Sequence, residues 1–167
     1  KQEKIYYDSE WKVCKEENAK YYRVYGTYDN LSNSWPIKSY YKNGTIQFIG
    51  NVQNNSHEAI NCRTAKCNDQ AIFYNEKGLK TSIYFYKNGV LHGPSSYFYE
   101  NGKLKMLIEF ENGELRDKFF IECDEFGTCQ KMFYENFSND ENVNEWTIVS
   151  DNKDFETSII KEKGLLM

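Results

Sequence analysis

A short phrase of aromatic residues, one charged residue and Asn-Gly recurs along this chain. It reads YYKNG at 40–44, FYKNG at 85–89, FYENG at 98–102 and FENG at 110–113. The turn glycines Gly78, Gly89, Gly102, Gly113 and Gly127 are separated by 11, 13, 11 and 14 residues. This spacing argues against chance Asn-Gly pairs in a chain rich in Asn, Lys and Tyr. It indicates a supersecondary unit of about 24 residues, two strands and two turns, that is copied and stacked.

Asn-Gly between alternating apolar residues favours a two-residue type I′ hairpin, because both central positions of that turn need positive φ. We therefore predict such turns at 43–44, 88–89, 101–102 and 112–113, in an all-β antiparallel meander with little helix. At 101–102 the register that follows pairs Glu100 with Lys103, Tyr99 with Leu104, Phe98 with Lys105 and Tyr97 with Met106. The segment 10–25 fits either a short helix near Glu16–Lys20 or a strand.

The same register divides the side chains between two faces, because successive side chains of a strand point to opposite sides. The expected buried face pairs Tyr41 with Ile46, Tyr86 with Leu91, Tyr99 with Leu104 and Phe110 with Leu115. The opposite, mixed face pairs Tyr40 with Gln47, Phe85 with His92, Phe98 with Lys105 and Glu109 with Arg116. Exposed aromatic residues among polar ones are typical of interaction sites.

We therefore predict a binding surface on the mixed face, formed by Tyr40, Gln47, Phe85, His92, Phe98 and Lys105. The alternative is that a terminal segment or the twist of the sheet covers these aromatic rings. In the predicted domain organisation, 1–35 is an N-terminal cap segment, 36–137 holds the hairpin repeats and 138–167 is a C-terminal capping hairpin, since a repeat array needs atypical ends.

Five cysteines favour an oxidising compartment. A three-residue loop at 125–127 would place Cys123 opposite Cys129, and we predict a disulfide there and a second one between Cys62 and Cys67, with Cys14 free. The chain shown begins at Lys1 rather than Met, which fits removal of an export signal. No run of 18 apolar residues is present, so no transmembrane segment is expected.

The segment FYKNGVLHGPSSYFYENGKLK, residues 85–105, resembles the variant MORN repeat of bacterial proteins, and weaker copies cover about 60% of the chain. The chain departs from that motif at its second glycine, which is kept only as Gly93. The resemblance implies an extended MORN-like sheet and an exported, periplasmic or extracellular bacterial protein. It also implies an antitoxin or immunity role, in which the protein binds a toxic partner.

The residues that carry catalysis or bind cofactors do not cluster in this sequence. Only two histidines occur, and the cysteine intervals of five and six positions miss the tighter spacing of zinc sites. We therefore expect no catalytic residues, no metal and no cofactor, and a net charge of −4 gives no reason to expect nucleic acid as a partner. Two functions remain: a non-catalytic module that binds another protein, for which a toxin is one candidate, and a structural module of the bacterial cell envelope.

Overall fold

The computed structural model describes residues 3–55, 61–116, 119–134 and 148–151. The strands are β1 (Lys4–Tyr7), β2 (Tyr21–Tyr25), β3 (Trp35–Tyr41), β4 (Ile46–Val52), β5 (Cys67–Tyr74), β6 (Lys80–Lys87), β7 (Val90–Leu91), β8 (Gly93–Phe98), β9 (Leu104–Glu111), β10 (Glu114–Leu115), β11 (Phe119–Cys123), β12 (Cys129–Tyr134) and β13 (Ile148–Asp151). Helix in this part of the chain is limited to one 3₁₀ turn, η1 (Glu16–Asn18). The ambiguous segment 10–25 thus contains both this turn and β2.

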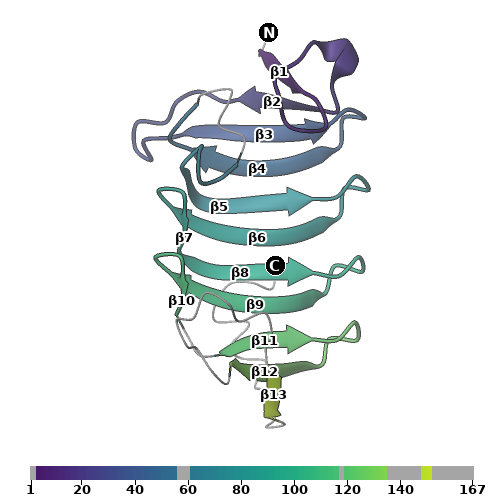
Figure 1. Ribbon diagram of the computed structural model, residues 1–167, viewed down its shortest axis with the longest axis vertical. Helices are drawn as coiled ribbons and strands as arrows, with labels where there is room; N and C mark the ends of the chain where they lie inside the picture. The colour runs from purple at the N-terminus through teal and green to yellow at the C-terminus, as the bar shows by residue number, and fades with distance from the viewer. Residues whose placement is uncertain (1–2, 56–60, 117–118, 135–147, 152–167) are drawn as a thin grey trace.

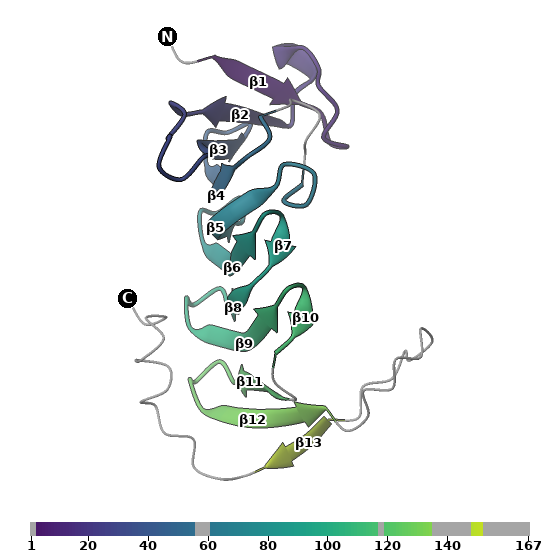
Figure 2. The same ribbon diagram turned by 90° about the vertical axis from the view of Figure 1, so that its left-hand side faces the viewer.

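All strands belong to one antiparallel sheet in meander order, as the sequence predicts. Eleven of them follow one another across the sheet, while the short strands β7 and β10 pair with β6 and β9 at one end of those strands. The two rows of turns at the strand ends are called the two edges below. Figure 1 shows the strands stacked in chain order, and Figure 2 shows the sheet nearly edge-on as a single layer. Such a sheet has two open faces and two rows of turns on which a site can lie.

The turns beside β7 and β10 are the predicted two-residue hairpins. Asn88 and Gly89 have φ of 53° and 83°, as a type I′ turn requires, and Tyr86 lies opposite Leu91. The turn at 112–113 has the same form, with Phe110 opposite Leu115. Both predictions are confirmed.

The turns at the other edge are three-residue loops, so the prediction for 101–102 is wrong. The N–H of Tyr99 donates to Lys103 O, and Phe98 rather than Tyr99 lies opposite Leu104. The extra residue forms a bulge, a common companion of a type I turn with Gly in the left-handed region. Beyond the bulge, Tyr97 lies opposite Met106 as predicted. The turn at 43–44 has the same form and pairs Tyr40, not Tyr41, with Ile46.

Successive units also bond to each other through their turns. At the edge with β7 and β10, Gly89 N–H donates to Cys67 O and Gly113 N–H donates to Leu91 O, both at 2.8 Å. At the opposite edge, the hydroxyl of Tyr99 donates to Cys123 O at 2.8 Å. The turn residues therefore hold neighbouring units together, in addition to closing their own hairpins.

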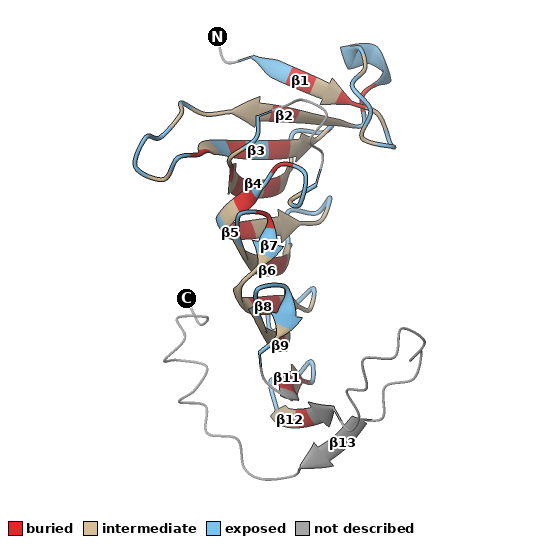
Figure 3. Cartoon of the chain, turned by 60° about the vertical axis from the view of Figure 1, so that its left-hand side comes forward, coloured by how far each residue is buried: buried red, intermediate tan, exposed pale blue. Residues whose placement is uncertain are grey.

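Register and burial define two faces. The aliphatic face carries one cross-strand row of Ile49, Ile72, Ile83, Ser96, Leu107 and Ile121. The aromatic face carries Phe48, Phe73, Tyr84 and Tyr97, whose ring centroids are 4.8, 5.5 and 5.6 Å apart in succession. Side chains are most buried in the middle of the strands and exposed at the turns (Figure 3).

The residues expected to form one buried face do not share a face, because Tyr86 lines the cavity on the aromatic face while Leu104 packs against the cluster that contains Leu107 on the aliphatic face. They are also only half-buried, because they lie at the strand ends. The half-buried members are Tyr41, Tyr86, Tyr99 and Leu104. The expectation came from counting outward from each turn, which favours residues near the edges. Cross-strand neighbours on both sides bury the residues at mid-strand, as they do for Leu107 at 4% exposure.

The N-terminal segment that was predicted to be a cap belongs to the described part of the chain from residue 3 onwards. Within 1–35, β1 and β2 continue the sheet, and Tyr7 in β1 is fully buried. The predicted C-terminal capping hairpin at 138–167 lies outside the described residues, apart from β13.

Both predicted disulfides are present, between Cys62 and Cys67 and between Cys123 and Cys129, and Cys14 is free. They indicate an oxidising environment. No helix in the part of the chain that the structure describes is long and apolar enough to cross a membrane.

Candidate functional site

The six residues predicted to form a binding surface do not lie together. Tyr40, Phe85 and Phe98 share the aliphatic face, where Tyr40 stacks on Tyr22 with ring centroids 4.8 Å apart. All three are half-buried. Gln47 is a bulge residue on β4 and lines a cavity on the aromatic face instead. The predicted pairing of Tyr40 with Gln47 is therefore wrong.

Lys105 is also displaced from its predicted partner, because the bulge at 98–105 shifts the register. Its ammonium lies 5.5 Å from the ring centroid of Tyr99, while Lys80 covers the ring of Phe98 at 5.3 Å. The predicted mixed face is thus not one continuous stripe of aromatic and polar residues.

His92 has a structural role at the sheet edge. Its N–H donates to Phe85 O at 2.9 Å, which confirms that these two residues face each other. Its Nδ1 accepts a hydrogen bond from Asn112 N–H at 3.4 Å. One unit earlier, the side chain of Asn68 accepts from Asn88 N–H in the same way. His92 therefore replaces an asparagine as a support for the next turn.

A partly open cavity of about 280 Å³ lies on the aromatic face. Its walls come from β2 to β6, the loop before β5 and the N-terminal segment. The apolar part is formed by Ile37, Phe48, Val52 and Phe73, and the aromatic rim by Trp11 and Tyr86. An apolar hollow with a few polar groups is the usual form of a binding site.

Arg23 provides the cation in this cavity. It comes from the middle of β2, where the alternation in YYRVY directs it to the aromatic face, and it is only 4% exposed. Its Nε–H donates to the hydroxyl of Ser39 at 3.1 Å. The guanidinium lies 5.3 Å from the ring centroid of Tyr7 and 5.6 Å from that of Trp11, distances at which cation–π attraction operates.

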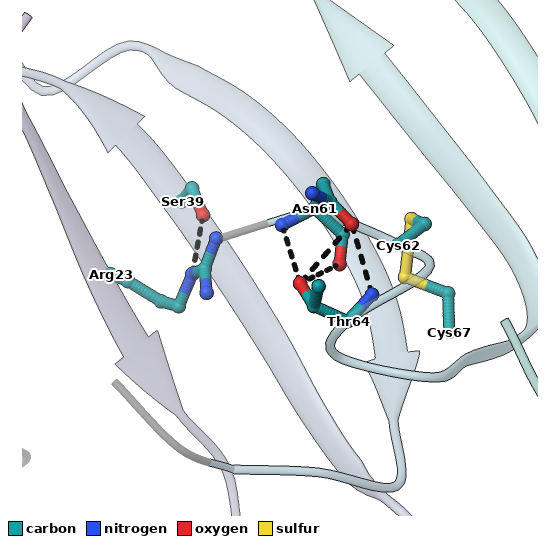
Figure 4. Close-up of a disulfide and its surroundings, with 6 residues drawn as sticks. All are labelled: Arg23, Ser39, Asn61, Cys62, Thr64 and Cys67. Atoms are coloured by element: carbon teal, nitrogen blue, oxygen red, sulfur yellow. Dashed lines mark hydrogen bonds between the residues drawn. A yellow bond between two sulfur atoms is a disulfide. The ribbon is translucent and has the colours of Figure 1, made fainter. Parts of the chain in front are cut away.

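A disulfide-closed loop forms one wall of the cavity. Asn61, Cys62 and Ala65 line the cavity from this loop, and the disulfide ties Cys62 to Cys67 at the start of β5. Asn61 Oδ1 accepts a hydrogen bond from Thr64 N–H at 2.9 Å, which holds the loop in a tight turn. Figure 4 shows the loop with its disulfide and the nearby bond between Arg23 and Ser39. The wall is therefore covalently fixed.

The polar groups that line this cavity are suited to binding. They include the guanidinium of Arg23 and the amides of Gln47 and Asn61, which can hold a polar or anionic group beside an apolar one. Among the described residues, no group of three or more His, Cys, Asp or Glu could hold a metal ion. The turn pattern did not indicate Arg23 or Trp11 as site residues. The signal that could have indicated Arg23 is its position between aromatic residues in YYRVY.

Titration of Tyr86 provides a test of this environment. Burial raises its pKa to about 12, and the nearby Tyr84 adds to the rise. An unfolded tyrosine has a pKa of about 10, so the folded state holds this proton more tightly. The stability that this group contributes is complete below about pH 10 and is lost as the pH rises towards 12. We expect the thermal midpoint of wild type to fall between about pH 10 and pH 12, and that of Tyr86→Phe to fall less. An identical fall in both proteins would contradict the raised pKa of Tyr86.

The fold and this cavity define the protein as a single-layer β-meander with a fixed pocket at one end. Comparison with protein families, curated proteins and solved structures found no match to this chain. The resemblance to the MORN repeat therefore stays a prediction.

Proposed function

We propose that this chain is a non-catalytic repeat module that binds another protein, and that the cavity on the aromatic face receives an anchor side chain of that partner. The observation that carries the proposal is the combination of apolar walls, a buried guanidinium and a covalently fixed loop in one hollow. Tryptophan, tyrosine and arginine are the residues most enriched at the energetic centres of interfaces. A rigid pocket binds with little loss of conformational entropy.

We further propose that the module acts in an oxidising compartment outside the bacterial cytoplasm as an antitoxin or immunity protein. The two disulfides support the compartment, and the repeat resemblance supports the role. The second candidate, a structural module of the cell envelope, is supported by the turn-to-turn hydrogen bonds, which would help a sheet to resist mechanical force.

Affinity capture with folded, disulfide-bonded protein tests the binding proposal. Gln47→Trp places a large ring in the cavity, and Phe98→Ser changes the aliphatic face, where part of the predicted surface lies. We expect Gln47→Trp to abolish enrichment of a specific exported protein, such as the toxin-like product of a neighbouring gene, while Phe98→Ser retains it. Thermal melting of both variants serves as the folding control.

The opposite pattern, loss with Phe98→Ser alone, would move the binding surface to the aliphatic face. Equal capture by wild type and both variants would favour the structural candidate. Neutralisation of the captured protein's toxicity by wild type but not by Gln47→Trp would establish the immunity role.

A further inference from the structure

The hairpin between β11 and β12 carries an exposed aromatic residue that the fold does not require. Phe126 lies at the tip of its three-residue turn and is 86% exposed. The corresponding positions of the other three turns at this edge hold Asn43, Lys77 and Asn101, all polar. Since the same turn forms with polar residues, the turn geometry does not explain a phenylalanine at this position.

The backbone of this tip is firmly held. The disulfide between Cys123 and Cys129 closes its base, and Asp124 Oδ1 accepts hydrogen bonds from Phe126 N–H and Thr128 N–H, both at 2.9 Å. The preceding turn supports it from the side, because Lys103 Nζ donates to Phe126 O at 2.7 Å. A rigid exposed aromatic residue is suited to binding, since little entropy is lost when it enters a pocket.

The cavity on the aromatic face has the size to take this ring. It measures about 280 Å³, and an apolar protein cavity of about 150 Å³ is enough to bind benzene. The ring would meet Phe48 and Phe73 on its faces or edges, as aromatic pairs prefer.

The charges around the two features are complementary. Asp124 and Glu125 precede Phe126 at the tip, where Lys103 offsets one of these two negative charges. The loop that walls the cavity carries exposed Arg63 and Lys66 between its lining residues. Opposite charges around a central apolar contact favour the correct orientation and speed association.

We propose that the hairpin tip of one copy inserts Phe126 into the cavity of a second copy. The tip joins β11 to β12, whereas the cavity is lined from β2 to β6, and these strands lie towards opposite ends of the sheet (Figure 1). The contact is therefore head-to-tail. Such a contact leaves one tip and one cavity unoccupied, and association continues into chains or closes into a ring. The inference rests on the proposed function only in using the same cavity, and a partner that fills the cavity would disassemble the chains.

Sedimentation velocity over a range of protein concentrations tests the proposal. We expect wild type to form species larger than a dimer as its concentration rises, and Phe126→Ala to weaken this association about tenfold or more. The matched control is Leu31→Ala, which removes an apolar side chain that is 98% exposed at a different loop. A wild type that stays monomeric, or an equal loss in both variants, would overturn the proposal.

A mixing experiment identifies the two surfaces. Phe126→Ala keeps an intact cavity, and Gln47→Trp keeps an intact tip, so each variant alone is expected to stay monomeric at concentrations where wild type has begun to associate. Together they should form a one-to-one dimer that grows no further. Arg63→Glu, a change of an exposed side chain on the cavity rim, replaces Gln47→Trp if that variant melts early. Absence of the mixed dimer would show that Phe126 and the cavity are not the two sides of one contact.

The two proposals fail in distinguishable ways. If wild type is monomeric but Gln47→Trp loses an exported partner, self-association is refuted and partner binding stands. If chains form through Phe126 but no variant of the cavity affects partner capture, self-association stands and partner binding in the cavity is refuted.

Discussion

Replacing Phe48 by alanine is expected to lower the free energy of unfolding by about 3–5 kcal/mol, the usual range for a buried phenylalanine. The ring is 5% exposed and packs in the cluster that contains Ile37 and Val52. It also contacts the ring of Phe73 with centroids 4.8 Å apart, in an edge-on arrangement. Because the sheet is a single layer, few atoms are available to refill the space. Urea unfolding monitored by circular dichroism measures the change.

Phe126→Ala is the matched control, since it removes the same side chain from an exposed position. We expect its effect on stability to stay within about 0.5 kcal/mol, measured where the protein is monomeric. A cost for Phe48→Ala below about 1 kcal/mol would show that the aromatic face is not part of the core, contrary to the burial pattern.

Replacing Gly89 by alanine is expected to cost about 2–5 kcal/mol, from two separate causes. Gly89 has φ of +83°, a conformation that costs an alanine about 1–2 kcal/mol. Its added Cβ would also lie 2.9 Å from Arg63 O and 3.1 Å from Cys62 O. These are backbone atoms of the disulfide-closed loop, and relieving such contacts typically costs about 1–3 kcal/mol more.

Gly102→Ala separates the two causes. Gly102 has φ of +81°, but no atom lies within 4 Å of the position that its Cβ would take. We expect it to show the conformational cost alone, about 1–2 kcal/mol. Equal destabilisation of the two variants in urea unfolding would mean that the loop moves away from Gly89 at no cost, and that the cavity wall is less fixed than the disulfide suggests.

The features predicted correctly from the sequence depend on short stretches of chain. The meander follows from strands joined by turn glycines at regular intervals. The pairing of Cys123 with Cys129 follows from the loop that separates them. In each case, the residues that determine the feature are at most 14 positions apart, so local geometry is sufficient.

The predictions that failed depend on contacts between units. Asn-Gly fits both a two-residue turn and a three-residue turn with a bulge. At 88–89 the glycine N–H donates to Cys67 O of the preceding unit, whereas at 101–102 it donates to Tyr99 O within its own turn. The bulges then move Gln47 and Lys105 away from their expected partners.

The sequence by itself determined an antiparallel sheet of repeated hairpins and its two disulfides, because turn residues and cysteine spacing act over a few positions. Only the tertiary structure decided the type of each turn, the residues that share a face and the position of the cavity. The cavity requires Trp11, Arg23, Phe48 and Tyr86 to meet. These residues come from four segments far apart in the chain, and only the stacking of strands, which buries their side chains against one another, brings them together.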